Sequence, residues 1–140
     1  MEITDSKSLD HHGLVGGIIA DLGLQTLIDN RLPKDSRAKI SDGQAVSAML
    51  INSLGFTSRP LSLTPHFFAS KAVDVLFGEG VEAGDFNRHR LGRCLDRIYA
   101  YGCDKLFSEL AHHMCSSEGI SKQFISLDTT SFKVTGAYDA

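Results

Sequence analysis

The 140-residue sequence has no tryptophan, only three prolines and only three cysteines. It also lacks long apolar runs, because Gly or Ser interrupts each one before it could span a membrane. With 42% hydrophobic and 22% charged residues, the composition is that of a globular chain that can bury a core, not that of a disordered one. The length suits one domain, or one domain plus a piece of another.

The cysteines, Cys94, Cys103 and Cys115, are odd in number and have no paired spacing, which argues against a disulfide framework. His112 and Cys115 are three residues apart on an expected helix, but no second ligand pair accompanies them, and His11–His12 has none either. A zinc site is therefore not expected, and two of the three thiols are expected in apolar helical faces.

The amino-terminal stretch "MEITDSKSLDHHG" is polar and acidic, unlike a signal peptide, so a cytoplasmic location is expected. The formal net charge is −3, which does not by itself indicate a nucleic-acid-binding protein. Any such role has to come from a local cluster of cations.

Apolar residues recur at helical spacing from about residue 12 to residue 118, which predicts five to seven helices with short connections. Gly23, Gly55, Gly78 and Gly102 are expected to end helices, since Gly tolerates the left-handed conformation found there. The expected capping residues are Ser41, paired with Gln44 in a capping box, and Asp104. The residues expected in the core include Leu14, Val15, Ile18, Ile19, Leu22, Ala45, Val46, Met49, Leu50, Leu54, Phe67, Phe68, Val73, Leu76, Phe77, Leu91, Cys94, Leu95, Ile98, Leu106, Phe107, Leu110, Ala111 and Met114.

The segment "DFNRHRLGRCLDRIYAYG" combines an apolar helical face with a second face that carries cations. These cations could neutralise phosphates, which would make binding strongly dependent on salt. The alternative is an ordinary solvated face that Asp85 and Asp96 partly neutralise. The sequence leaves both interpretations open, and the candidate DNA-binding residues are Arg88, His89, Arg90, Arg93 and Arg97.

After Gly119 the pattern changes to that of a β-strand, "KQFISLDTTSFKVTGAYDA". Apolar residues alternate around Asp128, but with a change of parity near residues 129–131. Such a strand is either covered on both faces or bulged, and an isolated strand cannot satisfy its own backbone groups. The chain is therefore expected to end just inside a second domain.

Asp128 has two local interpretations. It could cap a turn with Thr130, as Asx and Ser/Thr motifs do, or it could bind a metal in two-metal phosphoryl-transfer chemistry. An aspartyl nucleophile of the haloacid-dehalogenase type is excluded, because that motif needs a second Asp where Thr130 stands.

The stretch "SLDTTSFKVTGAYD" resembles the strand that carries the first catalytic Asp of DDE-type insertion-sequence transposases, which have an RNase-H-like catalytic domain. The segments "SLDHHGLVGGIIADLGL", "SDGQAVSAMLINSLGFTSRPL" and "DFNRHRLGRCLDRIYAYG" resemble the helical amino-terminal region of one branch of these transposases. The resemblance implies that Asp128 is a catalytic ligand for Mg²⁺ or Mn²⁺ in the full-length parent. The second Asp and the final Glu of the triad have no counterpart, so the fragment is expected to be inactive and to bind neither metal.

The expected fold is mainly α: a compact helical domain over residues 1–120, then residues 121–140 as the first β-strand of an incomplete RNase-H-like domain. The expected function is that of a truncated transposase that binds DNA at transposon ends or associates with full-length transposase or with itself, away from any membrane. The alternative is a stand-alone helical protein-interaction module without DNA affinity, whose strand pairs with a partner sheet. A nuclease assembled from several chains is not favoured, since the other carboxylates are absent.

Overall fold

Residues 7, 9–33, 35–54 and 60–121 are described by the structure, which is a computed structural model. Within these residues the chain is mainly helical, as predicted, and has no β-strand. The predicted strand and Asp128 lie outside the described residues. No helix in the described ranges is long and apolar enough to cross a bilayer. The helices are α1 (Asp10–Asp21), α2 (Leu24–Asp29), α3 (Asp42–Ser53), α4 (Thr64–Phe68), α5 (Val73–Phe77), α6 (Arg88–Tyr101) and α7 (Cys103–Ser117), with 3₁₀ turns η1 (Leu61–Leu63) and η2 (Ala83–Phe86).

The helix ends follow local sequence rules. Gly23 separates α1 from α2 in a left-handed conformation, with φ of 63°. Ser41 caps α3: its hydroxyl accepts a hydrogen bond from the Gln44 amide, while the Gln44 side chain accepts one from the Ser41 amide. Gly78 and Gly102 end α5 and α6 at positive φ, as predicted. The prediction that Asp104 caps α7 is wrong, because the helix begins one residue earlier, after Gly102, and has no side-chain cap.

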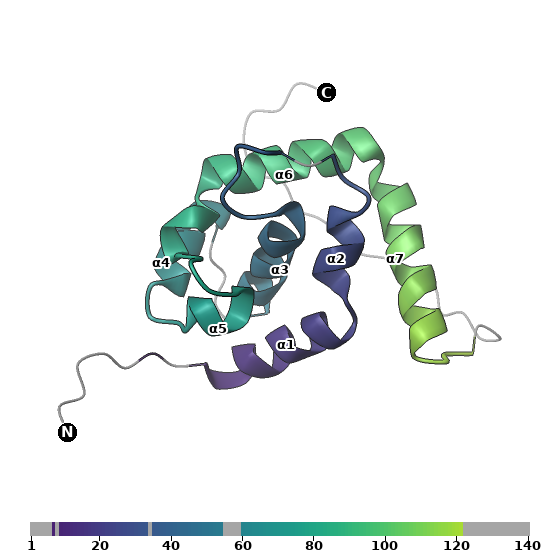
Figure 1. Cartoon of the computed structure of the whole chain (residues 1–140), viewed down its shortest axis with the longest axis horizontal. Coiled ribbons are helices and arrows are strands. Elements are labelled where there is room, and N and C mark those ends of the chain that lie inside the picture. Colours follow the sequence, from purple (N-terminus) through teal and green to yellow (C-terminus); the bar gives the residue numbers. More distant parts are fainter. Residues whose placement is uncertain (1–6, 8, 34, 55–59, 122–140) are drawn as a thin grey trace, which may run out of the picture.

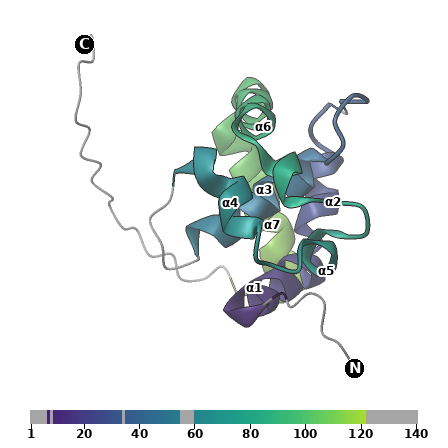
Figure 2. The ribbon, with the colours of Figure 1, turned by 90° about the vertical axis from the view of Figure 1, so that its left-hand side faces the viewer.

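The helices surround α3, which runs through the middle of the molecule (Figure 1). In that view α6 lies along the top, α7 turns down the right-hand side, α1 lies at the bottom, and α4 and α5 lie on the left. Figure 2 views the molecule from the α4–α5 side, and α6 appears there nearly end-on. α6 lies across the amino-terminal end of α3, and the chain turns a corner from α6 into α7.

An aromatic cluster forms the part of the core between α4, α5 and η2. Phe68 and Phe86 are fully buried, and their ring centroids are 5.3 Å apart. Phe77 lies within 4.7 Å of Phe86 and meets Phe68 edge-on at 5.3 Å. Because Phe86 is the last residue of η2, its burial anchors the chain just before α6 begins.

Two glycines allow helices to approach each other closely. A Cβ built at Gly43 would lie 2.3 Å from the Gln25 carbonyl oxygen, so α3 contacts the main chain of α2 there. A Cβ at Gly16 would lie 2.9 Å from Leu76 Cδ2, so α1 approaches α5 closely there. Gly17 faces open space.

Several apolar residues predicted in the core are exposed. Each lies on a predicted helix or, for Leu54, directly after one, but the neighbouring helices cover a different side of it. On α3, for example, the buried face is formed by Ala45, Ala48 and Ile51. The exposed residues, with their exposed fractions, are Leu14 (71%), Ile18 (50%), Leu50 (38%), Leu54 (53%), Leu95 (43%) and Phe107 (73%).

Candidate nucleic-acid interface

The amino-terminal end of α6 carries most of the predicted DNA-binding residues. Asn87 caps this helix, since its side-chain oxygen accepts a hydrogen bond of 3.0 Å from the Arg90 amide. Upstream, the Asp85 carboxylate accepts a 2.8 Å hydrogen bond from the Glu82 amide, which fixes the turn that leads into the helix. The start of α6 is therefore held on both sides of the buried Phe86 ring.

Arg90 does not face solvent, although the sequence placed it in a cationic stripe. Only 8% of the residue is exposed, and its guanidinium donates hydrogen bonds to the Ile40 carbonyl at 2.8 and 3.1 Å. The remaining nitrogen donates to the Asp42 carboxylate at 2.8 Å. Arg90 thus joins α6 to the start of α3, and all three of its guanidinium nitrogens are engaged inside the protein.

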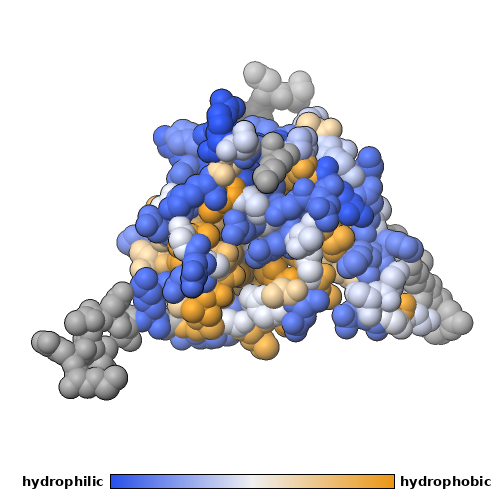
Figure 3. Space-filling view, viewed as in Figure 1, coloured by the Kyte–Doolittle hydropathy of each residue, from blue (hydrophilic) through white to orange (hydrophobic). Residues whose placement is uncertain are grey.

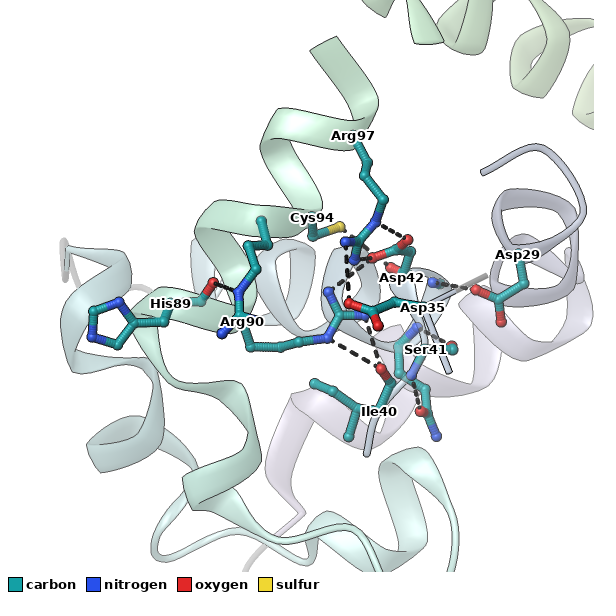
Figure 4. A network of polar contacts seen from close by, with 12 residues as sticks. Asp29, Asp35, Ile40, Ser41, Asp42, His89, Arg90, Cys94 and Arg97 are labelled. Carbon is teal, nitrogen blue, oxygen red and sulfur yellow. Dashed lines mark hydrogen bonds and ion pairs between the residues drawn. The ribbon is translucent and has the colours of Figure 1, made fainter. Parts of the chain in front are cut away.

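Arg97 is also directed inward (Figure 4). Its Nε donates to Asp42 at 2.7 Å, a second nitrogen donates to the other oxygen of the same carboxylate, and a third lies 3.6 Å from Asp35. Only 5% of the Asp42 side chain is exposed, so this carboxylate is shared by two arginines inside the protein. The prediction that Arg90 and Arg97 share a solvent-facing stripe with Arg93 is wrong, because both are directed to Asp42.

These contacts control the ionisation of Asp42. Burial alone would raise the pKa of its carboxyl, but the hydrogen bonds from Arg97 and Arg90 outweigh burial and hold the pKa below its usual range. The same hydrogen bond raises the pKa of Arg97. Asp35 also has a lowered pKa, chiefly because its carboxylate accepts a hydrogen bond from the Arg37 amide. All of these groups are charged at neutral pH.

Cys94 lies beside this network and is fully buried. Its Sγ donates to the Asp42 carbonyl at 3.7 Å, and burial raises the pKa of the thiol to about 12. Such a thiol is protonated at neutral pH and is not a nucleophile. The prediction that Cys94 is a small buried side chain is confirmed.

Three predicted residues remain on the outside: Arg88, His89 and Arg93 are all exposed. Arg88 Nε lies 3.5 Å from the His89 ring, and Arg93 Nε donates to the His89 carbonyl at 3.3 Å. Among the residues that the structure describes, neither Arg88 nor Arg93 forms an ion pair with a carboxylate. Their assignment to a DNA-binding surface stays a prediction.

The connection between α2 and α3 adds cations that the sequence analysis did not select. Arg37 and Lys39 help line a hollow of about 170 Å³, together with Arg90, Arg93, Asp35 and Asp85. The Arg37 side chain is 89% exposed and lies 3.8 Å from Asp35, whereas Lys39 is paired with Asp85 at 2.9 Å. The stretch "PKDSRAK" carries three cations in seven residues, which was a signal for this contribution.

We call Arg37, Arg88, His89 and Arg93 the basic surface. It lies where the α2–α3 connection meets the start of α6. In Figure 3 hydrophilic side chains dominate this part of the molecule, while hydrophobic ones gather over α5 and along α1. The surface is not uniformly positive, because Asp96 is exposed one turn along α6 and Glu82 is exposed before it.

The predicted metal ligand, Asp128, lies outside the described residues, so the structure brings it together with no other site residue. Within the described ranges, no three His, Cys, Asp or Glu side chains are grouped so that they could hold a metal ion. His112 and Cys115 likewise belong to no such group in these ranges.

Residues 4–112 match a protein family described as a domain of unknown function, DUF4277. The chain belongs to the DUF4277 family. The matched region takes in α1 to α6 and the first part of α7, and therefore the whole basic surface. No curated protein and no solved structure matches the chain. DUF4277 membership identifies the helical domain but assigns it no activity.

Proposed function

We propose that this DUF4277 domain binds the phosphate backbone of DNA through the basic surface, as the amino-terminal domain of a DDE-type transposase. The observation that carries the proposal is the position of three exposed guanidinium groups, on Arg37, Arg88 and Arg93, around the start of one helix. The resemblance of the helical segments and of the strand around Asp128 to these transposases supports DNA as the ligand.

The physical basis is electrostatic. Guanidinium groups bind phosphate oxygens and release the counterions that surround DNA, so affinity falls steeply with salt. The amino end of α6 adds a partial positive charge from the helix dipole. Contacts of this kind position a protein on DNA without reading its sequence.

The proposal includes no cleavage by this chain alone. Asp128 is proposed as one ligand of Mg²⁺ or Mn²⁺, ions that would activate a water or a 3′-hydroxyl for attack on a phosphodiester. One carboxylate cannot hold two ions, so the remaining ligands would have to come from the rest of an RNase-H-like domain.

A binding titration with a short DNA duplex, followed by fluorescence anisotropy at salt concentrations between about 50 and about 200 mM, tests the proposal. Replacing Arg88 and Arg93 by Gln should weaken binding and reduce the slope of log affinity against log salt by about two. The matched control replaces Lys7 and Lys105 by Gln, which removes the same charge from two exposed positions outside the basic surface and should leave that slope unchanged.

Binding that is absent at the lowest salt, or that both double variants weaken equally, would contradict the proposal. Arg90 and Arg97 are unsuitable for this test, because both bind Asp42 inside the protein and their replacement should destabilise the fold.

A second candidate is a protein-interaction module that assembles with another copy of the chain or with a full-length transposase. The exposure of Tyr99 (82%), Phe107 (73%) and Leu95 (43%) around the α6–α7 corner favours it. Sedimentation separates the two candidates: a chain that self-associates with rising concentration, and binds no DNA at low salt, is an interaction module.

A further inference from the structure

His12 is buried at the start of α1, where only 3% of the residue is exposed. Among the residues that the structure describes, neither ring nitrogen has a hydrogen-bond partner, although the Leu9 main chain lies nearby. The ring meets Phe67 of α4 edge-on at 5.1 Å and lies 3.9 Å from the His11 ring. An imidazole in this position is accommodated as an apolar ring.

The charges around His12 also disfavour a positive charge on its ring. Lys71, in the connection after α4, lies close enough to act on the ring electrostatically, as does His11. Asp10 is the neighbouring acid, but its carboxylate is bound to the Lys71 ammonium at 2.8 Å. A proton added to His12 would therefore lie in an apolar pocket beside a cation.

α1 is attached to the core by few side chains. His12 and Ile19 are its only residues classed as buried, whereas Leu14 is 71% exposed and Ile18 is 50% exposed. Asp10 begins the helix at φ of 46°, which is unusual for a residue other than Gly. His12 is thus the only buried residue in the amino-terminal half of α1, residues 10–16, where Val15 is partly buried against the core.

We propose that α1 is a pH-sensitive latch, whose amino-terminal half leaves α4 when His12 takes up a proton. Release would expose the Phe67 ring and the Leu76 side chain that packs against Gly16. The latch is a property of this chain's own packing and does not depend on DNA binding.

The direction of the pH effect follows from linkage. Burial, then the charges of His11 and Lys71, lower the pKa of docked His12 from its ordinary 6.5, against weaker opposite effects of Asp10 and the Leu9 main chain. Released His12 has the ordinary pKa and binds protons more readily. Docking is therefore complete above pH 6.5 and is lost as the pH falls. Below pH 6.5 the equilibrium constant for docking drops about tenfold per pH unit, until the pH reaches the pKa of docked His12.

The test is NMR on the whole chain. Titration of the imidazole protons should give His12 a pKa below its ordinary 6.5. Amide hydrogen exchange of residues 12–19, divided by the intrinsic rate at each pH, should speed up at least several-fold between about pH 7.5 and about pH 5.5. The amide of Ile28 in α2 is the internal reference and should keep its protection. A His12 pKa at or above 6.5, or α1 protection independent of pH, overturns the proposal.

Two variants localise the effect. His12→Phe keeps an aromatic ring against Phe67 but cannot titrate, so α1 protection should become independent of pH in this range. His11→Gln should retain the pH dependence. The opposite pattern overturns the proposal, and if His12→Phe does not fold, the wild-type titration decides alone.

Discussion

Two kinds of arginine occupy one helix. Arg93 reaches solvent, whereas Arg90 and Arg97 are bound to Asp42, which lies at the first position of α3. Taking these charges out of water has a cost, and the network offsets it because the carboxylate has partners for both oxygens. Removing the Asp42 carboxylate leaves Arg90 buried without a charged partner.

Asp42→Asn should therefore destabilise the protein by about 3–5 kcal/mol, the cost of breaking a buried ion pair. The amide keeps the shape of the side chain but leaves Arg90 buried without a counter-charge. Urea unfolding, followed by circular dichroism, measures the change.

The matched control is Asp96→Asn, an identical change at an exposed position on α6. It should alter the free energy of unfolding by less than about 0.5 kcal/mol. Equal effects of the two substitutions would show that the Asp42 network contributes no stability beyond that of a surface charge.

At the scale of elements, the contact between α2 and α3 depends on a missing side chain. Gly43 lies in the first turn of α3, where its amide donates a 2.7 Å hydrogen bond to Asp29 at the end of α2. The Gln25 carbonyl fills the space that a Cβ at position 43 would need. The two helices can only be this close with Gly there.

Gly43→Ala should cost at least about 1–3 kcal/mol, because the added methyl group must push the two helices apart. Gly17→Ala is the control: its Cβ meets nothing within 4 Å, and Ala favours a helix interior by about 0.5–1 kcal/mol. Thermal unfolding should thus give Tm shifts of opposite sign. A stabilised Gly43→Ala variant would rule out the close approach.

Helix ends were predictable from the sequence, because their causes are local. Gly23, Gly78, Gly102 and the Ser41–Gln44 capping box each act within a few residues. Buried faces were predicted less well. The apolar stripes of these helices are wider than their contacts, so only the tertiary arrangement decides that Ile51 is buried and Leu54 exposed.

At the scale of the whole molecule, acidic groups tie distant parts of the chain together. Glu109 on α7 accepts hydrogen bonds from Tyr101 and from Arg31, and these lower the pKa of its carboxyl, the Tyr101 bond most. Asp42 and Asp35 have lowered pKa values for the reasons given above. Together they join α2, α3, α6 and α7.

Acid should therefore weaken the fold. Each of these carboxylates binds protons less readily when folded than when unfolded, so its contribution is complete above about pH 5 and is lost as the pH falls further. The free energy of unfolding, measured in urea at about pH 6 and about pH 3, should drop. The drop should be smaller in Asp42→Asn, and an unchanged value in the wild type would contradict this account.

For the whole molecule, the sequence predicted a mainly helical fold, because apolar residues recur along it at helical spacing and glycines follow at the expected helix ends. The site was predicted only in part: Arg88, His89 and Arg93 are exposed, but nothing local marks Asp42 as the partner of Arg97, 55 residues away. Arg37 was passed over because it lies in a connection, and its approach to Arg93 requires the α3–α6 packing.

The close approach at Gly43 also limits how this sequence can diverge. A clash with a side chain can be relieved by a second substitution that shortens the side chain. The atom opposite Gly43 is a main-chain oxygen, which every amino acid at position 25 carries. No substitution at position 25 can therefore act as a local suppressor of a larger residue at position 43, and compensation has to come from shifting α2 as a whole.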